Sequence, residues 1–256
     1  MPGAFEGRTV VITGAGGGQG QHAAIMFARE GANVAFCDVI ELEETLQRIG
    51  HECSNVLPYR ADLSDIENIR SFVDATLDRF QSIDIVYNNA GVNFVSPISD
   101  TTEEDWDRVH AINVKAAFFL VKFALTALRN SSSASVINIS SGAGLLAPAD
   151  GNAVYCSSKG ALIALTRAQA RDLAKDGIRV NCLLPGPVET PMIQRFFDSF
   201  PADQRQAAYE ASVSRSMLKR FGQPEEIVSI AMFLASPAAS YLTGAIIPVD
   251  GGWTST

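Results

Sequence analysis

A tyrosine and a lysine stand four positions apart in the stretch NAVYCSSKG, residues 152–160. The sequence predicts a helix over residues 153–170, so Tyr155 and Lys159 would share one helical face. A phenol with its ordinary pKa of about 10 is a poor base at neutral pH, but a neighbouring cation stabilises the phenolate and lowers that pKa. Tyr155 could therefore act as a general acid or base. The simpler alternative is a partly buried aromatic residue beside a solvated surface charge.

A glycine-rich turn near the N-terminus could hold phosphate groups. The segment TGAGGGQG, residues 13–20, follows a predicted strand and opens a predicted helix. Glycines let the backbone approach a pyrophosphate, and a helix N-terminus offers N–H groups and a partial positive charge. The spacing is TGxxxGxG, with Gly14, Gly18 and Gly20, rather than GxGxxG. Glycine-rich turns also serve only to turn the chain, so this pattern alone leaves both interpretations open.

An acidic residue, Asp38, ends the second predicted strand. A carboxylate there can accept hydrogen bonds from both hydroxyls of an adenosine ribose, and it would repel a 2′-phosphate. No Arg or Lys lies in the glycine turn or directly after Asp38. We therefore expect NAD as the cofactor in preference to NADP. The alternative is a loop aspartate that caps the following helix.

The elements that would position these residues alternate along the chain. Short apolar runs occur at 9–13, 33–39, 83–89, 134–140, 178–184 and 245–250, with a weaker one at 55–63 that Pro58 assigns to a sheet edge. Segments with helical periodicity lie between them, and Gly31, Gly177 and Pro224 mark expected helix ends and starts. This alternation predicts an α/β fold, a doubly wound Rossmann-type domain whose parallel seven-stranded sheet carries helices on both faces.

One long stretch, residues 187–223, falls outside this rhythm. No linker or repeat divides the chain, so we expect a single domain over residues 1–256, with this stretch inserted as a substrate lid. Its apolar side chains would either line a pocket or pack a small helical hairpin; they are Met192, Ile193, Phe196, Phe197 and Phe200.

Composition narrows the class of protein. The 256 residues carry 20 Lys plus Arg against 28 Asp plus Glu, a net charge of −8, which gives no electrostatic footprint for nucleic acid. No apolar window is long enough for a membrane span, and no secretory signal is visible, so we expect a cytoplasmic protein. The four cysteines and three histidines show no metal-ligand spacing, and we expect no metal; we assign packing roles to the cysteines, Cys37, Cys53, Cys156 and Cys182.

Nearly the whole chain resembles the short-chain dehydrogenase/reductase family. The motifs that carry the resemblance are TGAGGGQG at 13–20, Asp38, ADL at 61–63, NNAG at 88–91, Asn113, NISS at 138–141, YCSSK at 155–159, PGPVET at 185–190 and VDGG at 249–252. Each piece is short, but their order and spacing together are highly specific. Two positions depart from the pattern: Gln19 and Tyr87 stand where the family usually has aliphatic residues.

The resemblance implies a set of cofactor-binding residues. Asp62 would meet the adenine amino group, Asn89 would fix the turn that shelters the cofactor, and Thr190 would lie near the nicotinamide carboxamide. The full implied set is Gly14, Gly18, Gln19, Gly20, Asp38, Asp62, Leu63, Asn89, Ala90, Gly91, Tyr155, Lys159, Pro185, Gly186, Val188 and Thr190.

The resemblance also implies a catalytic set of Asn113, Ser141, Tyr155 and Lys159. Lys159 would tune Tyr155 and bind the nicotinamide ribose. Ser141 would hydrogen-bond the substrate oxygen; Ser140 competes, since strand-end geometry permits either. Asn113 would hold a water in a proton relay, or bond a neighbouring backbone. The small residues 156–158 and Gly160 would leave room for the dinucleotide.

These residues predict an oxidoreductase that transfers a hydride between NAD(H) and a secondary alcohol or ketone. Alternatives are a 3-oxoacyl thioester reductase, which would normally use NADPH, and a non-catalytic dinucleotide sensor. Apolar residues near the expected pocket, including Phe94, Leu145 and Leu146, favour a cyclic, aliphatic or steroid-like substrate. Three lid arginines, Arg195, Arg205 and Arg215, leave this open. The resemblance also implies that the long helices at 102–128 and 153–176, the first with its apolar run at 118–123, pair across subunits in a homodimer or homotetramer; the alternative is that both faces lie buried within one chain.

Overall fold

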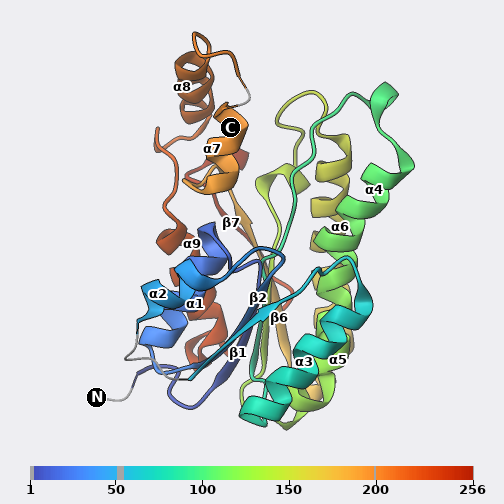
Figure 1. Ribbon diagram of the computed structural model, residues 1–256, viewed down its shortest axis with the longest axis vertical. Helices are drawn as coiled ribbons and strands as arrows, with labels where there is room; N and C mark the ends of the chain where they lie inside the picture. Colours follow the sequence, from blue (N-terminus) through green and yellow to red (C-terminus); the bar gives the residue numbers. More distant parts are fainter. Residues whose placement is uncertain (1–2, 51–54, 199, 256) are drawn as a thin grey trace.

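A parallel seven-stranded sheet forms the centre of the protein (Figure 1). The computed structural model describes residues 3–50, 55–198 and 200–255, so His51 and Cys53 lie outside the described residues. The strand order is β3-β2-β1-β4-β5-β6-β7, and the order reverses between β1 and β4, which confirms the predicted doubly wound α/β fold. The strands are β1 Thr9–Thr13, β2 Asn33–Asp38, β3 Val56–Arg60, β4 Ile85–Asn88, β5 Ser135–Ile139, β6 Arg179–Pro185 and β7 Ile246–Val249.

The strand that contains Pro58, β3, lies at an edge of the sheet, as predicted. In β3, Pro58 is in register with Phe36 of β2, and β2 is its one neighbour in the sheet. Pro has no backbone N–H and cannot donate to a ladder, so an edge position costs least. The central strands, such as β1, β5 and β6, are buried apolar runs because helices cover both of their faces.

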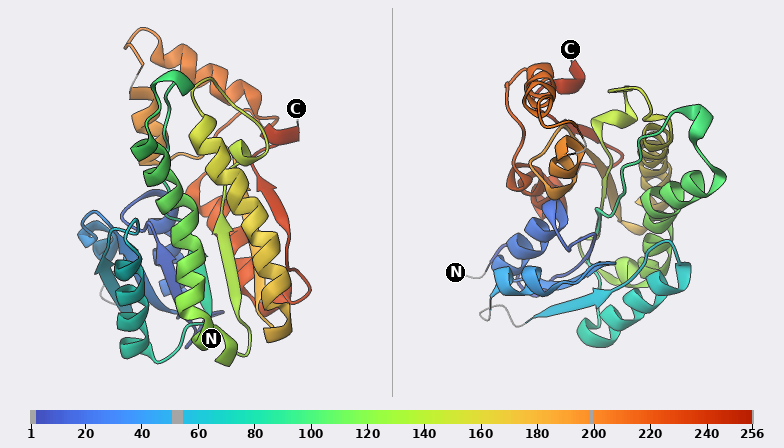
Figure 2. Two further views of the ribbon diagram at one scale, coloured as in Figure 1. Left: turned by 90° about the vertical axis from the view of Figure 1, so that its right-hand side faces the viewer. Right: turned by 45° about the horizontal axis from the view of Figure 1, so that its top comes forward.

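Helices cover the two faces of the sheet in separate layers. Val10 and Ile12 of β1 pack with α1 and α9 on one face, while Val11 packs with α3 and α5 on the other. Figure 2 shows α5 and α6 side by side on the second face. The helices are α1 Gly18–Arg29, α2 Glu43–Ile49, α3 Ile66–Phe80, α4 Glu103–His110, α5 Ala116–Asn130, α6 Ala153–Leu173, α7 Pro191–Asp198, α8 Arg205–Arg215 and α9 Pro224–Ala235.

Three predicted helix boundaries are confirmed. The helix α1 ends at Arg29, and Gly31 follows with a φ of +84°. A 3₁₀ turn continues α6 to Asp176, where Gly177 takes up a φ of +72°. Such left-handed positions favour glycine, which has no Cβ to clash. Pro224 is the first residue of α9, where its missing N–H costs nothing.

The long helix that contains Asn113 is not a regular α-helix. A π turn, Ala111–Lys115, joins α4 to α5, and Asn113 is fully buried within it. π turns are rare and concentrate at functional sites. Among the described residues one helical stretch, Glu103–Asn130, is long and apolar enough to cross a membrane, and 39% of its most apolar window is buried in the protein. A core helix passes the same test of length and composition.

The apolar run of α5 divides between the interior and the surface. Leu120 and Val121 are buried against the sheet, and the guanidinium of Arg70 from α3 lies 4.3 Å from the ring centre of Phe123. Phe118 remains 46% exposed. The run is therefore only partly covered within one chain.

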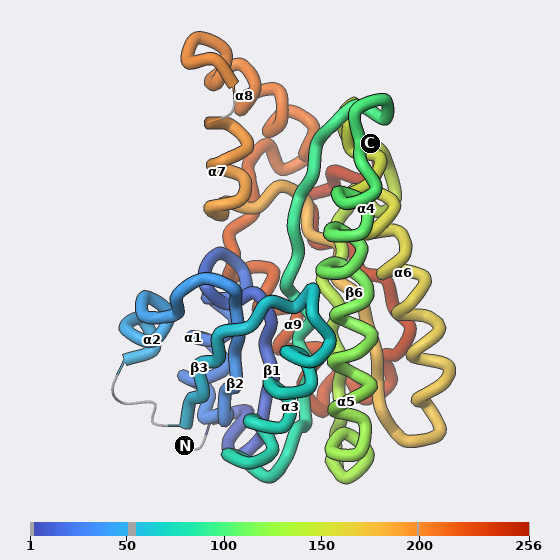
Figure 3. Tube along the Cα trace, turned by 45° about the vertical axis from the view of Figure 1, so that its right-hand side comes forward, coloured from blue at the N-terminus to red at the C-terminus, as the bar shows by residue number. Residues whose placement is uncertain are grey.

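The segment expected to form a lid folds into two helices, α7 and α8, beyond the carboxyl ends of the strands. Figure 3 shows both at the same end of the molecule as the chain that rises from β4 toward α4. Its apolar residues both pack the two helices together and line a pocket, the two roles considered for them. Phe197 is buried and packs on Tyr209 and Phe221, with ring centres 5.6 and 5.8 Å away. Its neighbours Ile193 and Phe196 line a cavity described below.

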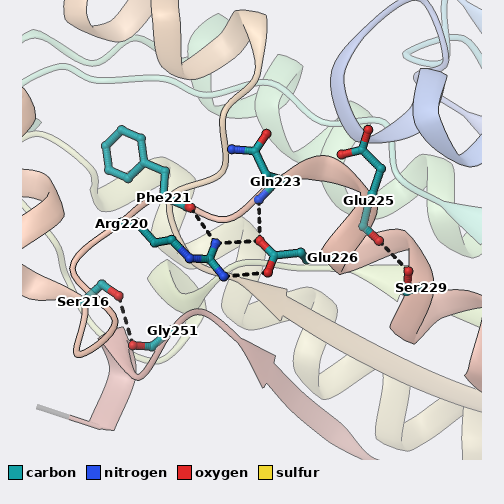
Figure 4. A network of polar contacts seen from close by, with 8 residues as sticks. All are labelled: Ser216, Arg220, Phe221, Gln223, Glu225, Glu226, Ser229 and Gly251. Atoms are coloured by element: carbon teal, nitrogen blue, oxygen red, sulfur yellow. Dashed lines mark hydrogen bonds and ion pairs between the residues drawn. The ribbon is translucent and has the colours of Figure 1, made fainter.

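The end of this lid is anchored to the rest of the fold (Figure 4). Arg220 binds both carboxylate oxygens of Glu226 at 2.7 Å, and the N–H of Gln223 donates to the same carboxylate at 2.8 Å. These contacts lower the pKa of Glu226 to about 2. Ser216 donates a hydrogen bond to the carbonyl of Gly251 near the C-terminus at 3.0 Å. The residues that follow α8 are therefore held on both sides.

Tyr87 of β4 carries a buried hydroxyl group with no hydrogen-bond partner among the described residues. Its environment is apolar, and burial raises the pKa of Tyr87. Since an unsatisfied buried polar group costs free energy, we expect Tyr87→Phe to raise the free energy of unfolding by about 1 kcal/mol. Thermal unfolding would show a midpoint about 2 °C or more above that of the wild type. A lower midpoint would mean that the hydroxyl group has a partner in solution.

Candidate active site

Glycine is required at positions in the glycine turn because neighbouring atoms leave no room for a Cβ. A Cβ on Gly14 would lie 2.8 Å from the Cα of Ala90, and one on Gly20 would overlap the carbonyl of Gly14. The amide of Asn89 donates to the carbonyls of Thr13 and Gly14, both at 3.0 Å. The turn is thus tied to the end of β4, as the role predicted for Asn89 requires.

Asp38 lies opposite this turn, at the end of β2. One carboxylate oxygen accepts the N–H of Gly16 at 2.8 Å, and the other accepts the N–H groups of Val39 and Ile40 at 2.7 and 3.3 Å. These backbone donors fix a negative charge at the mouth of the cleft. The carboxylate caps no helix: the next helix, α2, begins at Glu43 with Leu42 before it.

A cleft of about 720 Å³ runs between these groups along the carboxyl ends of the strands. Most of the expected cofactor residues line it: Gly14, Gly18, Gln19, Asp38, Asp62, Leu63, Asn89, Ala90, Gly91, Tyr155, Lys159 and Thr190. Gly20 does not, because it packs against Gly14. Pro185, Gly186 and Val188 line a second, adjoining cavity instead.

Several further residues line the cleft that the predicted set of cofactor residues does not include. They are Gly16, Gly17, Val39, Ile40, Ala61, Val92, Ile112, Ile139, Ser140, Pro191, Met192 and Arg195. Most of them lie within or directly beside the predicted motifs, so taking each whole motif with its flanking positions would have found them. Ile112 and Arg195 lie in helices, and only the tertiary structure brings them to the cleft.

The structure brings Asn113, Tyr155 and Lys159 together around Gly91. A Cβ on Gly91 would lie 3.1 Å from the ammonium nitrogen of Lys159 and 3.3 Å from the amide oxygen of Asn113. The same ammonium donates to the carbonyl of Ile139 at 3.0 Å and lies 5.8 Å from the ring centre of Tyr155. Tyr155 and Lys159 therefore share one end of the cleft, and Asn113 lies buried behind Gly91.

Asn113 uses its amide to hold backbone and helix together. Its oxygen accepts the N–H of Val92 at 2.8 Å, and its nitrogen donates to the carbonyl of Val92 and the hydroxyl of Ser158, each at 3.0 Å. The predicted alternative, a bond to neighbouring backbone, therefore occurs. The water relay stays a prediction, and it would rest on a side chain that is already firmly placed.

The two candidate serines have different environments. Ser140 is buried, and its hydroxyl donates to the carbonyl of Lys159 at 2.7 Å, so it supports the helix α6. Ser141 lines the second cavity, and its side chain hydrogen-bonds Tyr155. This geometry favours Ser141 as the group that meets a substrate oxygen.

The predicted tuning of Tyr155 by Lys159 stays a prediction, because burial is the largest influence on the pKa of Tyr155 in this structure. Burial raises the pKa of Tyr155, and the hydrogen bond from Ser141 only partly opposes that rise. Burial also lowers the pKa of Lys159 to about 8. The ammonium is directed at the carbonyl of Ile139, at 3.0 Å, rather than at the phenol oxygen. A phenol that is neutral at pH 7 suits a proton donor.

The small residues after Tyr155 serve helix packing rather than cofactor access, which corrects their predicted role. None of Cys156, Ser157, Ser158 and Gly160 is among the residues that line the cleft. At about 100° per residue, Cys156, Ser157 and Gly160 project away from the side of α6 that carries Tyr155, whereas Ser158, three positions on, lies next to it. Ser158 contacts Asn113, and the neighbouring 3₁₀ turn packs closely on α6, since a Cβ on Gly144 would lie 2.9 Å from the backbone of Lys159. Cys156 is half-buried, and burial raises the pKa of its thiol.

The second cavity, of about 410 Å³, lies between the lid and the loop after β5. Tyr155, Gln19, Ser140, Thr190 and Met192 line both the cleft and this cavity, so the two spaces adjoin. Its apolar wall consists of Pro148, Val188, Met192, Ile193, Phe196, Phe200 and Trp253. Phe94, Leu145 and Leu146 were expected here and are not among the lining residues; Leu145 points outward and is 55% exposed.

Comparison with known proteins finds the same architecture and length. A family model described as Enoyl-(Acyl carrier protein) reductase matches residues 14–254. The 3-oxoacyl-acyl-carrier-protein reductase of Thermotoga maritima is 34% identical over 252 residues, 97% of this chain and 98% of that protein. The meso-2,3-butanediol dehydrogenase of Serratia marcescens is 35% identical over 254 residues, 98% of this chain and 96% of that protein.

Solved structures agree. The crystal structure of levodione reductase matches with a TM-score of 0.93 and 32% identity, covering 98% of this chain and 99% of that one. Each of these matches covers nearly the whole chain. The chain belongs to the short-chain dehydrogenase/reductase family.

Proposed function

We propose that the protein transfers a hydride between NAD(H) and a secondary alcohol or its ketone. The observation that carries this proposal is the position of Tyr155, which lines both the dinucleotide-sized cleft and the adjoining apolar cavity. A group at that boundary can reach a substrate oxygen while the reacting carbon faces the cofactor. A binding module would have no need of an acid–base residue there.

A bound nicotinamide supplies the hydride chemistry; the chain's own residues handle the proton and the substrate oxygen. In the direction of oxidation, Tyr155 takes the hydroxyl proton as the carbonyl forms, and in reduction it returns that proton. Ser141 holds the oxygen by a hydrogen bond and stabilises the charge that develops on it. Lys159, charged below its pKa of about 8, lies 5.8 Å from the ring centre of Tyr155, and its positive charge would favour the phenolate form.

We further propose NAD rather than NADP, and the fixed carboxylate of Asp38 supports this choice. This carboxylate accepts three backbone N–H groups and forms no ion pair with an Arg or Lys among the described residues, so a 2′-phosphate would meet repulsion. Arg60, which donates to the carbonyl of Val39, pairs with Glu41. A homo-oligomer built on exposed α5 residues and a cytoplasmic location remain predictions.

A 3-oxoacyl thioester reductase is the second candidate, because the relative from Thermotoga maritima carries that name. The same residues would serve both reactions, so substrate and cofactor must discriminate them. Asp38 and the apolar cavity favour the secondary alcohol dehydrogenase.

The test is a substrate panel. Formation of NADH from NAD would be followed with small aliphatic, cyclic, terpenoid, steroid and polyol secondary alcohols, and oxidation of NADPH with a 3-oxoacyl thioester. We expect turnover in one class of alcohols. Thioester reduction with NADPH alone would favour the second candidate, and no turnover despite measurable NAD binding would favour a sensor.

Gln19 gives a second test of the cleft. Its amide oxygen is buried without a hydrogen-bond partner among the described residues, at the boundary of both spaces. A bound cofactor would supply the missing donor, so we expect Gln19→Leu to raise the Kd for NADH about fivefold while the apo fold becomes no less stable. Fluorescence titration of NADH measures the first effect and thermal unfolding the second. An unchanged Kd would show that the cofactor leaves this oxygen unsatisfied.

A further inference from the structure

The three lid arginines point in three directions. Arg205 donates to the carbonyls of Asp198 and Phe200, at 2.9 and 3.1 Å, and so serves the lid itself. Arg195 lines the cofactor cleft. Arg215, the last residue of α8, lines the second cavity.

Arg215 gives this cavity an unbalanced charge. It is the one Arg or Lys among the described residues that line the cavity, and no Asp or Glu lies among them. No carboxylate of the described chain lies within ion-pair distance of its guanidinium either. In a protein with a net charge of −8, a single cation among otherwise uncharged lining residues is a distinctive feature.

The guanidinium is held in place by its neighbours. One nitrogen donates to the carbonyl of Pro148 across the cavity at 2.5 Å, which leaves the other donors of the fork available. The next residue, Ser216, is bonded to the carbonyl of Gly251 at 3.0 Å, so the end of α8 cannot easily turn away (Figure 4). Asn152, buried at the start of α6, is one of the uncharged polar residues that line the same cavity.

We propose that Arg215 binds a carboxylate of the substrate, so that the protein acts on hydroxy acids and oxo acids with an apolar body. This rests on the function proposed above and names its substrate class. The reacting carbinol would lie at Tyr155 and Ser141, the apolar body against Phe196 and Phe200, and the carboxylate at the fork of Arg215. A planar guanidinium matches a carboxylate with two parallel hydrogen bonds. A phosphate dianion would need more donors than one arginine in an apolar cavity supplies.

The test compares acids with their uncharged counterparts. Oxidation by NAD would be measured with 3-hydroxybutanoate, 4-hydroxypentanoate and 5-hydroxyhexanoate, each beside its methyl ester, in wild type, Arg215→Met, Arg215→Lys and Arg205→Met. Arg205→Met removes an equal charge from the same lid outside the cavity. Binding of the same acids to the complex with NADH would be measured by calorimetry.

For at least one pair we expect the wild type to prefer the acid by about tenfold or more in kcat/KM, since a hydrogen bond to a charged group is lost in the ester. Arg215→Met should remove that preference and leave the ester within about threefold, and Arg215→Lys should restore part of it. Arg205→Met should retain it. Because Arg215 is exposed on one side, the KM for the acid, and not for the ester, should rise with added salt.

Esters that react as well as the acids in every pair, or an equal loss of both in Arg215→Met, would overturn the assignment of Arg215 while the oxidoreductase stands. If no alcohol is turned over at all, the function proposed above fails, and calorimetry decides the carboxylate site alone. Binding of an acid that is lost in Arg215→Met supports the site; absence of binding refutes it.

Discussion

Replacing Tyr155 with phenylalanine is expected to lower kcat by a factor of about 10²–10⁴, because the variant can neither take nor return the proton of the substrate hydroxyl. The ring remains, so the wall between the cleft and the cavity is unchanged, and the Kd for NADH should stay within about threefold of the wild type. Steady-state turnover of the preferred alcohol and fluorescence titration of NADH measure the two quantities.

Tyr87→Phe is the matched control. This variant also removes a phenol oxygen, but from a buried tyrosine that lines neither the cofactor cleft nor the second cavity. Its turnover should equal that of the wild type. Residual activity of Tyr155→Phe within about tenfold of the wild type would contradict the acid–base role, since that role is worth more than this. Equal losses in both variants would point to a general defect of folding.

The second large effect concerns the choice between NAD and NADP. Asp38→Asn keeps the size of the side chain and one acceptor oxygen but removes the charge. Two of its present bonds, from Gly16 and Val39, run to different carboxylate oxygens, so the variant keeps only one of them intact. We expect the ratio of kcat/KM for NAD to that for NADP to fall by about tenfold or more, because a 2′-phosphate no longer meets a fixed negative charge.

Glu44→Gln serves as the control for net charge, since this exposed residue at the start of α2 lies outside the cleft. It should leave the cofactor ratio unchanged. A wild type that prefers NADP by more than about tenfold would refute the role of Asp38 before any variant is made. A change of the ratio in Glu44→Gln would show that the overall charge of the protein, rather than Asp38, selects the cofactor.

The sheet was predictable because its strands follow simple rules. Each predicted apolar run corresponds to a strand, and Pro58 placed the weakest of them at the edge. The helix boundaries at Gly177 and Pro224 follow from backbone conformations that few other residues share. Local signals of this kind need no knowledge of the tertiary structure.

Other features depend on contacts that a linear pattern does not contain. The one sequence signal for the π turn at Ala111–Lys115 is Asn113, because asparagine is a poor helix former. Its amide is hydrogen-bonded to Val92 and Ser158. The helix α2 was not predicted, because its seven residues are too short for a clear period.

The candidate site shows the same division. The motifs identified Tyr155, Lys159 and Asp38, and all three line the cleft. Burial raises the pKa of Tyr155, and neither that burial nor the 5.8 Å from the ammonium of Lys159 to the ring centre is contained in the spacing of the two residues. The orientation of Arg215 is likewise set by Pro148, which is 67 positions away in sequence.

The most direct test of the proposed reaction follows the hydrogen atom itself. A secondary alcohol from the reactive class, deuterated at the carbinol carbon, would be oxidised in ordinary water with NAD, and the NADH would be weighed by mass spectrometry. We expect NADH one mass unit heavier than with unlabelled alcohol, because the hydride passes directly from substrate to cofactor while only the hydroxyl proton exchanges through Tyr155. NADH without the label would contradict direct hydride transfer at this site.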